Sequence, residues 1–586
     1  MNIVEQHALR GLNVYSAQPC LLTVLDLELA AHAPAGHVEA CRRRMLALLP
    51  APPQHRAPDG WPGGAPQALD DGAAAARAVE DVAMALQCLA GTAPGLGHTE
   101  VAPGAAGRYR VVCGYAIEQV AIDAVDLALL LLNALLAEAT EPPMEPPLAL
   151  RLADGLAALR ATAQRRAIGT STAAILGAAT ARGIPSTRIT PKANMFTLGW
   201  GARQKRLQAS ITGDTGHIAV GIAADKELTK TLLQEAGVPV PEGTTARSLE
   251  QALRAARRLG GLVTVKPLDG NHGRGVTTRC GTDDQVALAF ERAREHGRTI
   301  IVERFIQGAD HRVLVAGGRV VAAALRRPAS VTGDGVSTVR QLVEAENRNP
   351  ARGEGHSNIL TRIPLDGHAE TTLAEQDLQL DSIPAAGRRV LLRGNANLSS
   401  GGTAEDVTDR LPAQTRAMCV RAARKIGLDV AGIDLVCEDI GVPLDGRNGA
   451  IIEINAAPGI RMHVHPSAGT PRDAGAAIVA SMFGDGDGRI PLIAVAGDGA
   501  AAVTPMIEHT LRRAGIATGC VSGDGAFVNG HAITRGDGGG YWAARTVLAA
   551  PEVEFAVLET PRAGILEHGL AFDRCDVAVL FDSGAG

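Results

Sequence analysis

Residues 432–435 read GIDL and residues 451–455 read IIEIN. In a strand, residues two apart share a face, so Glu453 and Asn455 point to one side while their apolar neighbours point into the core. Asp434, placed on an adjacent strand, completes a cluster of oxygen ligands that suits Mg²⁺ bound together with nucleotide phosphates. The alternative is a half-buried strand with a polar outer face. Because buried carboxylates without a cation are costly, the pattern favours a metal site.

Two segments upstream of this cluster predict a nucleotide site. Residues 265–267 read VKP and residues 270–276 read GNHGRGV. A lysine near a strand end and a glycine loop both suit a phosphate, although such a loop alone is more often a hairpin turn. Residues 300–306 read IIVERFI, and Asp310 follows. A strand edge offers backbone groups to adenine and a later carboxylate can bind ribose, although this pattern alone is more often an ordinary strand.

Strands and helices alternate on both sides of these segments. Apolar runs predict strands at 261–266, 299–303, 319–325 and 450–455, and helical patterns occupy 249–259 and 413–426. This alternation predicts an α+β or α/β catalytic domain over residues 151–489. A first domain, 1–150, has a loop-like insert at 50–68, a strand at 109–115, a helix through 139 and a proline-rich linker at 141–147. A last segment, 490–586, opens with an apolar strand.

Composition limits the class of protein. The 586 residues suggest about four domains, and the 57 basic and 62 acidic side chains nearly cancel. This balance disfavours a disordered chain or binding to nucleic acid through global charge. The nine cysteines form no C-x-x-C pair, which indicates reduced thiols in a cytoplasmic protein. The N-terminus carries Glu5 where a signal peptide is basic and apolar, and the run 127–136 is too short to span a bilayer, so we expect no membrane association.

Longer segments resemble one protein family. They are GWGARQKRLQASITGDTGHIAVGIAADKELTKTLLQEAGVPVPEG, VKPLDGNHGRGV, RNPARGEGHSNILT, NANLSSGGTAEDVTD and EINAAPGIRMHVHPSAGTPR, which together cover most of residues 196–475. They are similar to cyanophycin synthetase, a member of the ATP-grasp superfamily. Residues 7–140 are similar to the N-terminal domain of that family, and residues 490–586 to the start of its Mur-ligase-like third domain. The resemblance implies an α+β multidomain fold with an N-terminal α/β domain, a central ATP-grasp domain and a truncated Mur-like α/β domain.

The resemblance also implies ATP-dependent amide-bond formation with Mg²⁺. In such a reaction the γ-phosphoryl group moves to a carboxylate, and an amine then attacks the acyl phosphate. The matching motifs assign Lys226 and Lys266 to the phosphates, Glu303 and Asp310 to adenine and ribose, and Arg312 to the transferring group. Further residues implied are the loop positions His272, Gly273 and Gly275 for ATP, the metal ligands Asp434, Glu453 and Asn455, and the positions Arg393, Asn397, Ser399 and Gly401 for the growing chain end.

The sequence departs from this family pattern at two places. The third domain should open with a phosphate loop that ends in Gly-Lys-Thr, but Ala501 and Ala502 stand at the lysine and threonine positions. Since no cation or hydroxyl is left there, we expect no ATP at that site, and the early stop of the chain makes arginine addition unexpected. In the first domain, some family members carry two histidines and a glutamate for a metal. Arg77, Glu80 and Asp81 replace them, so we predict no metal and a solvated Glu80.

Two hypotheses from different classes follow. The first is a synthetase of the second type, which polymerises preformed β-aspartyl-arginine dipeptides and associates as a homo-oligomer. The second is an accessory subunit of a full-length cyanophycin synthetase, motivated by the lost sites and by Ser330 and Ser357, where the family pattern leads us to expect His and Glu. A ligase that adds a different amino acid is a weaker third option. His463 and His465 favour a structural or substrate-contacting role over metal binding, and Arg326 with Arg327 is interpreted as a surface pair.

Overall fold

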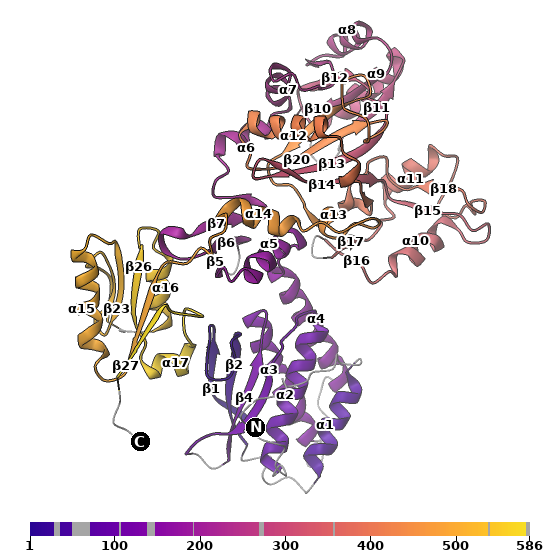
Figure 1. Ribbon diagram of the computed structural model, residues 1–586. Coiled ribbons are helices and arrows are strands. Elements are labelled where there is room, and N and C mark those ends of the chain that lie inside the picture. Colours follow the sequence, from indigo (N-terminus) through magenta and orange to yellow (C-terminus); the bar gives the residue numbers. More distant parts are fainter. Residues whose placement is uncertain are drawn as a thin grey trace. The chain divides into compact units, whose positions relative to one another are not determined.

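The computed structural model describes residues 1–27, 36–49, 71–104, 107–137, 147–190, 193–268, 275–355, 358–536 and 540–581. Contacts divide the chain into two compact units (Figure 1). Unit 1 comprises Met1–Ala167, Trp200–Gln204 and Arg489–Gly586, and unit 2 comprises Ile168–Gly199 and Lys205–Gly488. The N-terminal and C-terminal segments therefore pack together, and the division into three domains stays a prediction.

The N-terminal part of unit 1 is an antiparallel sheet covered by helices. The strand order is β1 (Asn2–Leu9), β2 (Cys20–Asp26), β4 (Arg108–Gly114) and β3 (Gly97–Val101). Side chains of β2 and β4 join one apolar core with the helices. The helices are α1 (His37–Leu48), α2 (Asp71–Leu89), α3 (Glu118–Ala137) and α4 (Leu148–Arg166). The strand and the long helix expected in this domain are confirmed, whereas the insert at 50–68 lies outside the described residues.

Helix α3 is apolar over more than the run 127–136. Its 20 residues are long and apolar enough to cross a membrane by length and composition, so length alone does not exclude a span as the argument from 127–136 assumed. However, its side chains Val125, Leu131 and Leu132 lie fully or almost fully buried in the core that α2 also lines. Its apolar character is therefore accounted for by packing within unit 1.

The C-terminal part of unit 1 is a second sheet of order β25-β24-β23-β26-β22-β27. The strands β22, β23, β26 and β27 run parallel, while β24 and β25 form an antiparallel extension. The Leu570 N–H donates to the Leu12 carbonyl at 2.8 Å, which ties this part to the N-terminal segment. Its elements are β22 (Leu492–Ala496), α15 (Ala500–Arg513), β23 (Thr518–Ser522), β24 (Gly525–Val528), β25 (His531–Arg535), α16 (Tyr541–Ala549), β26 (Phe555–Glu559), α17 (Arg562–His568) and β27 (Val577–Leu580).

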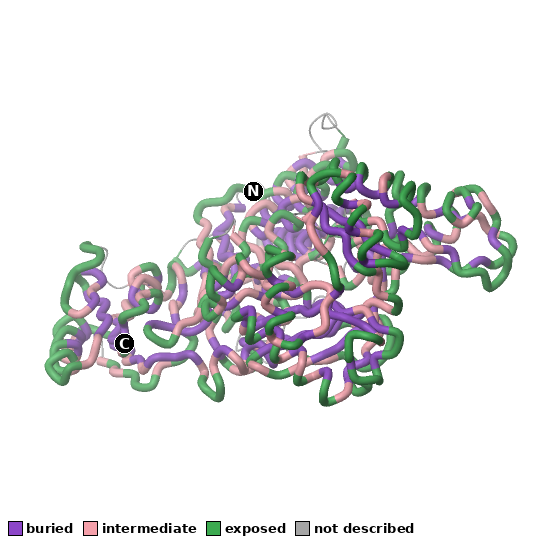
Figure 2. The backbone as a smooth tube through the Cα atoms, turned by 90° about the horizontal axis from the view of Figure 1, so that it is seen from above, coloured by how far each residue is buried: buried purple, intermediate pink, exposed green. Residues whose placement is uncertain are grey.

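Unit 2 contains two principal sheets. The smaller has the order β11-β10-β12-β9 and the larger β19-β14-β13-β20-β21, and both are antiparallel. Buried residues are purple in Figure 2, and they include all or nearly all residues of the strands β10 and β20. The smaller-sheet elements are α7 (Lys226–Glu235), β9 (Gly243–Ala246), α8 (Leu249–Leu259), β10 (Val263–Pro267), β11 (Thr277–Cys280), α9 (Asp283–Arg294) and β12 (Ile300–Arg304). The larger-sheet elements are α6 (His217–Ala224), β13 (Ala309–Ala316), β14 (Arg319–Arg327), β19 (Thr403–Asp406), α12 (Ala413–Ile426), β20 (Val430–Cys437) and β21 (Gly449–Asn455).

Local sequence signals explain why these elements begin and end where they do. Helix α8 starts after Ser248, whose side chain caps the Gln251 N–H, and α12 ends at Gly427, which adopts a φ of 89°. Both helices have the predicted bounds, and the four predicted strands correspond to β10, β12, β14 and β21. The predicted alternation of strands and helices is therefore confirmed.

Two smaller groups complete unit 2. One is the sheet β5-β6-β7-β8 with nearby helices, and the other is an insertion between β14 and β19. The first group contains α5 (Thr170–Ala181), β5 (Ser186–Arg188), β6 (Met195–Leu198), β7 (Lys205–Gln208), β8 (Ile211–Thr212), α13 (Arg461–Val464) and α14 (Ala474–Phe483). The insertion contains β15 (Ser330–Thr332), α10 (Val339–Asn347), β16 (Arg352–Gly353), β17 (Leu360–Thr361), α11 (Gly367–Ala374), β18 (Arg389–Leu391) and the short 3-10 helix η3 (Leu398–Ser400).

Candidate active site

The register of the larger sheet places Asp434 between an arginine and a carboxylate. Asp434 on β20 lies opposite Arg312 on β13 and opposite Glu453 on β21. The Arg312 guanidinium donates to both carboxylate oxygens of Asp434, from Nη2 at 2.9 Å and also from Nε. Burial alone would raise the pKa of Asp434, but the guanidinium groups of Arg312 and Arg326 outweigh it and hold the pKa below its usual value.

Arg326 on β14 is the second cation at this carboxylate. Its Nη2 lies 3.1 Å from Asp434 Oδ2 and 2.5 Å from Asp310 Oδ1. Arg326 is 7% exposed, so its interpretation as a surface residue was wrong. Arg327, its neighbour, is half-exposed and pairs with Glu405 at 2.8 Å. Two arginines and two aspartates thus form one buried network in which the charges balance.

A second charged cluster lies on the smaller sheet. Glu303 on β12 accepts a hydrogen bond from Lys266 Nζ at 2.5 Å and another from Lys230 Nζ. The side chains of Glu303, Lys266 and Lys230 are 4%, 9% and 14% exposed. Burial would raise the pKa of Glu303, but the two ammonium groups lower it. Burial lowers the pKa of Lys230, and the neighbouring Lys266 adds to this effect while Glu303 opposes it. The cluster therefore carries one positive charge in excess.

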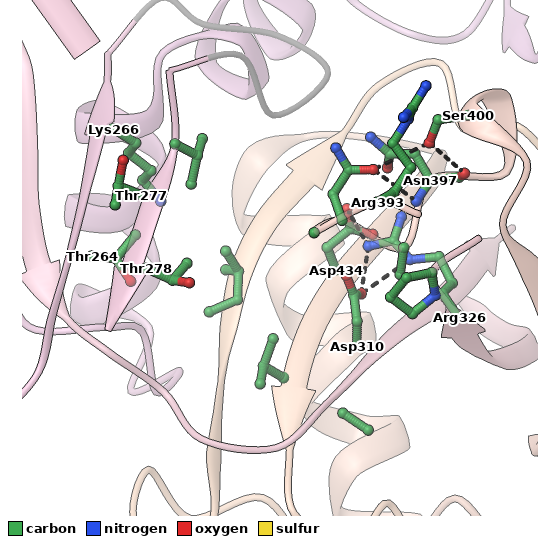
Figure 3. A pocket seen from close by; sticks show the side chains of 18 of the residues that line it. Thr264, Lys266, Thr277, Thr278, Asp310, Arg326, Arg393, Asn397, Ser400 and Asp434 are labelled. Atoms are coloured by element: carbon green, nitrogen blue, oxygen red, sulfur yellow. Dashed lines mark hydrogen bonds and ion pairs between the residues drawn. The ribbon is translucent and has the colours of Figure 1, made fainter. Parts of the chain in front are cut away.

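A cavity of about 1070 Å³ brings the two sheets' polar residues together. Lys266 and Thr264 of the smaller sheet face Asp310 and Asp434 of the larger one across it (Figure 3). Lys226, Glu303 and Glu453 line the same cavity. Lys226 donates to the Leu268 carbonyl at 3.0 Å, at the end of the segment after β10.

The insertion supplies another wall of this cavity. The predicted substrate residues Arg393, Asn397 and Ser399 line it, together with Asn395 and Ser400. Arg393 is 6% exposed and its Nη2 donates to Asp366 Oδ2 at 2.8 Å. Cationic and amide groups in such a wall suit a ligand with carboxylates and peptide bonds. The cavity thus has a lysine-bearing side and a side lined with amides, hydroxyls and an arginine.

Some predicted residues do not line this cavity. Arg312 and Asn455 are not among the lining residues, although Asp434 and Glu453 are. The Asn455 side chain donates to the Gly432 carbonyl at 3.3 Å. Gly275 and Gly401 are described but are not among the lining residues. His272, Gly273 and Ser357 lie outside the described residues, so their assignments stay predictions.

Of the carboxylates expected to hold Mg²⁺, Asp434 is paired with Arg312 and Arg326 through both of its oxygens, so Glu453 is the carboxylate that remains available. In the part of the chain that the structure describes, no group of three His, Cys, Asp or Glu side chains is close enough to hold a metal. Asp434 and Glu453 face each other across two strands, and Asn455 completes the set with an amide. The Glu453 carboxylate has no hydrogen-bond partner among the described residues, which leaves its oxygens able to take a cation. Two carboxylates and an amide are a set that needs nucleotide phosphates to fill the coordination of Mg²⁺.

One of the two histidines considered in the sequence analysis, His463, lies in the protein interior. His463 is 2% exposed, and neither ring nitrogen has a hydrogen-bond partner in the described structure. Burial, and to a lesser extent Arg312, lowers the pKa of His463 to about 3, so the ring is neutral at pH 7. Its burial without a charged partner is what a structural role requires, and the role itself stays a prediction.

Unit 1 holds the two places where the sequence departs from the family pattern. Glu80 is 6% exposed and accepts a hydrogen bond from Thr99 Oγ1 at 2.5 Å, so the prediction of a solvated side chain was wrong. Burial raises the pKa of Glu80. At the expected phosphate loop, a Cβ on Gly499 would lie 2.7 Å from the Phe581 ring, and a Cβ on Gly497 would lie 2.2 Å from the Phe581 carbonyl oxygen. Phe581 therefore occupies the space beside this loop.

Comparisons with known proteins identify the family. A cyanophycin synthase-like N-terminal domain model matches residues 22–137, and a prokaryotic glutathione synthetase ATP-grasp domain model matches residues 235–359. The chain is 40% identical to the cyanophycin synthetase of Synechocystis over 592 aligned residues, which cover 100% of this chain and 67% of that protein. The chain belongs to the cyanophycin synthetase family. It is an ATP-dependent ligase of the ATP-grasp type.

A cyanophycin synthetase of Crocosphaera subtropica is also 40% identical, over 100% of this chain and 67% of its own length. Other relatives match smaller parts. A glutathione biosynthesis bifunctional protein of Desulfotalea psychrophila is 33% identical over 52% of this chain and 39% of its own. Among solved structures, a bifunctional glutathione synthetase from Pasteurella multocida matches with a TM-score of 0.45 at 28% identity, over 63% of this chain and 52% of that one.

Proposed function

We propose that this member of the cyanophycin synthetase family joins preformed β-aspartyl-arginine dipeptides into a polymer, with one ATP-dependent peptide bond per dipeptide. The observation that supports this proposal is the contrast between the cavity of unit 2 and the expected second ATP site of unit 1. In unit 2, one cavity of about 1070 Å³ is lined by proposed residues of all three kinds: Lys226 and Lys266 for phosphates, Asp434 and Glu453 for the metal, and Arg393, Asn397 and Ser399 for the peptide. In unit 1, the expected second ATP site has Ala501 and Ala502, and Phe581 lies against its glycines Gly497 and Gly499.

The reaction proceeds in two transfers. The terminal carboxylate of the polymer attacks the γ-phosphorus of ATP, the bond to the bridging oxygen breaks, and ADP leaves, which yields an acyl phosphate. The amine of the incoming dipeptide then attacks the acyl carbon, the amine loses a proton, and inorganic phosphate leaves. Lys226 and Lys266 bind the ATP phosphates, and Glu303 and Asp310 bind adenine and ribose. Arg312 acts on the transferring group from beside Asp434.

Asp434, Glu453 and Asn455 would hold Mg²⁺, which when bound neutralises the charge of the phosphates. Arg393, Asn397 and Ser399 hold the polymer end at the opposite wall of the cavity. An arginine fits this role because its planar fork matches a carboxylate. Gly401 contributes through the turn that follows Ser399.

The deciding assay incubates the purified chain with ATP, Mg²⁺, a short polymer primer and either β-aspartyl-arginine or free aspartate plus arginine. Polymer growth with one ADP per dipeptide supports the proposal. Polymer and ADP from the free amino acids alone would refute it. Glu453→Ala should abolish ADP release, whereas Glu354→Ala, at a carboxylate that is 81% exposed, should leave it unchanged.

The accessory-subunit hypothesis gives a different result in the same assay. In that case the chain releases no ADP with either substrate set, and it raises the polymer yield of a full-length cyanophycin synthetase when the two are mixed. A screen of ADP release across other amino acids tests the third option, a ligase for a different substrate.

A further inference from the structure

Two buried arginines of unit 2 lie outside the cavity and outside the proposed chemistry. Arg352 on β16 has a side chain that is 2% exposed, and Arg461 on α13 is 6% exposed. Neither lines the cavity. A buried guanidinium is costly unless its N–H groups are paired, so the partners of these two residues indicate what they stabilise.

Arg352 connects three separate segments. Its Nη1 donates to the Thr361 carbonyl at 2.7 Å and to the Gly401 carbonyl at 3.1 Å. Its Nε and Nη2 donate to Glu346 Oε1 at 3.1 and 3.0 Å. The residue thus joins α10, β17 and the turn after η3 through one rigid fork. Hydrogen bonds from a charged donor are stronger than neutral ones.

Arg461 also binds Thr361, the residue whose carbonyl accepts from Arg352. Its Nη1 donates to the Asn358 carbonyl at 2.8 Å, and its Nη2 donates to Thr361 Oγ1 at 3.2 Å. No carboxylate pairs with Arg461 in the described part of the chain, and burial lowers its pKa. Arg461 follows β21 by six positions, so it is linked along the chain to the strand that carries Glu453 and Asn455. Both guanidinium groups therefore meet at Thr361.

The turn held by Arg352 carries the cavity's peptide wall. Gly401 adopts a φ of 93° directly after η3, and a Cβ there would lie 2.8 Å from the Ile363 side chain. Asn397 and Ser399, on the same turn, line the cavity. The Gly402 N–H closes the turn by donating to the Asn397 carbonyl at 3.1 Å. Because Arg352 binds the Gly401 carbonyl, it restrains residues 395–401 together.

We infer that Arg352 and Arg461 are positioning residues, which set the loop 395–401 relative to the metal-bearing strand β21. This inference rests on the proposed function, because it gives that loop the polymer end. The two arginines touch neither ATP nor the polymer. They act on peptide binding through Thr361 and Gly401, and the inference therefore predicts an effect on the peptide substrate that is separate from any effect on ATP.

The test is Arg352→Met, which keeps the length of the side chain and removes the fork. We expect KM for the polymer primer to rise about tenfold, as the loss of about 1.4 kcal/mol of loop anchoring implies, with KM for ATP changed less than twofold. Arg352→Lys should recover only part of the loss, since an ammonium group lacks the planar fork. Arg362→Met is the matched control, because that side chain is 56% exposed and lies 3.9 Å from Glu354.

A second variant keeps the inference testable if Arg352→Met does not fold. Thr361→Val removes only the bond from Arg461 and should raise KM for the primer about threefold without changing KM for ATP. Equal rises in both KM values, or a loss of thermal stability with unchanged KM values, would show that the arginines are merely structural and overturn the inference.

Hydrogen exchange separates this inference from the proposed function. In either variant the amides of residues 395–402 should exchange faster than in the parent chain, while those of α12 should not change. Faster exchange without any ligase activity in the parent chain would leave the loop anchoring intact and refute the proposed function. Normal exchange at 395–402 in both variants would overturn the anchoring itself.

Discussion

Lys230 should control how tightly the chain binds ATP, although no motif assigned it a role. In the structure Lys266 Nζ donates to Glu303 Oε1 at 2.5 Å, and Lys230 takes the other carboxylate oxygen. Lys266 can serve a phosphate only if it gives up part of its bond to Glu303. Lys230 makes that possible, because it neutralises the carboxylate that Lys266 leaves. Lys230→Met therefore gives Glu303 a single cation partner and keeps Lys266 on it.

The size of the effect follows from the bond that Lys266 must break. A hydrogen bond to a charged group contributes about 1.5–3 kcal/mol. Each 1.4 kcal/mol changes a dissociation constant about tenfold. Lys230→Met should therefore raise the Kd for ATP about ten- to hundredfold. Lys205→Met is the matched control, because that lysine pairs with Asp214 at 3.1 Å on the surface and is 36% exposed, and it should change Kd less than twofold.

Titration calorimetry with a non-hydrolysable ATP analogue measures these constants directly. A double-mutant cycle with Glu303→Gln tests the cause. Without the carboxylate, Lys266 is no longer held, so Lys230→Met should cost about threefold or less in that background. Additivity of the two substitutions within about 0.5 kcal/mol would refute the shared-carboxylate explanation, as would an unchanged Kd for Lys230→Met alone.

Three further predictions concern groups outside that cluster. Burial lowers the pKa of His311 to about 4 and of His463 to about 3, from 6.5 in the unfolded chain. Because the unfolded state therefore binds more protons, the free energy of unfolding of unit 2 falls by about 1.4 kcal/mol per histidine for each pH unit below pH 6, until the pH reaches the pKa of the folded state. His463→Gln should remove one of these two contributions when urea unfolding is compared at pH 5 and pH 7. Burial raises the pKa of Glu80, so its contribution to stability is present below the usual carboxyl pKa and is lost as pH rises; Glu80→Gln should raise the melting temperature of unit 1 more at pH 8 than at pH 5. Ala501→Lys with Ala502→Ser, in a Lys266→Ala chain, should not create ATP binding by calorimetry, since Phe581 packs against Gly497 and Gly499 of that loop. Binding that depends on these two substitutions would contradict this interpretation of the loop.

Much of the fold was predictable because it depends on local signals. Helices α8 and α12 have the expected bounds, since Ser248 caps the start of one and Gly427 ends the other. The alternation in residues 451–455 also placed Glu453 and Asn455 on one face. That Asp434 lies opposite Glu453 was an assumption from the sequence, and the strand register confirms it.

The cross-strand partners were not predictable in the same way. Arg326 joins Asp310 and Asp434, and Lys230 joins Glu303, over separations along the chain that no spacing rule covers. Arg326 next to Arg327 reads as a solvated pair because nothing in the dipeptide shows that β14 is an inner strand of the sheet. The prediction that Glu80 is solvated was wrong for a related reason. Its neighbours Arg77 and Asp81 are polar, and only the fold shows that Gly97 leaves room for its carboxylate inside the core.

These wrong or missing predictions share one physical cause, which decides which functional residues can be predicted from the sequence. A motif identifies a residue that acts on a ligand, since ligand chemistry restricts its type and its place on one element. A charge that balances this residue is restricted only by distance in the fold, and any element within reach can supply it. Lys266 was therefore recognisable from VKP, while Lys230 was not. Because the free energy of binding ATP depends on the balance of the whole cluster, substitutions at such unrecognised partners should change affinity while leaving every motif of the family intact.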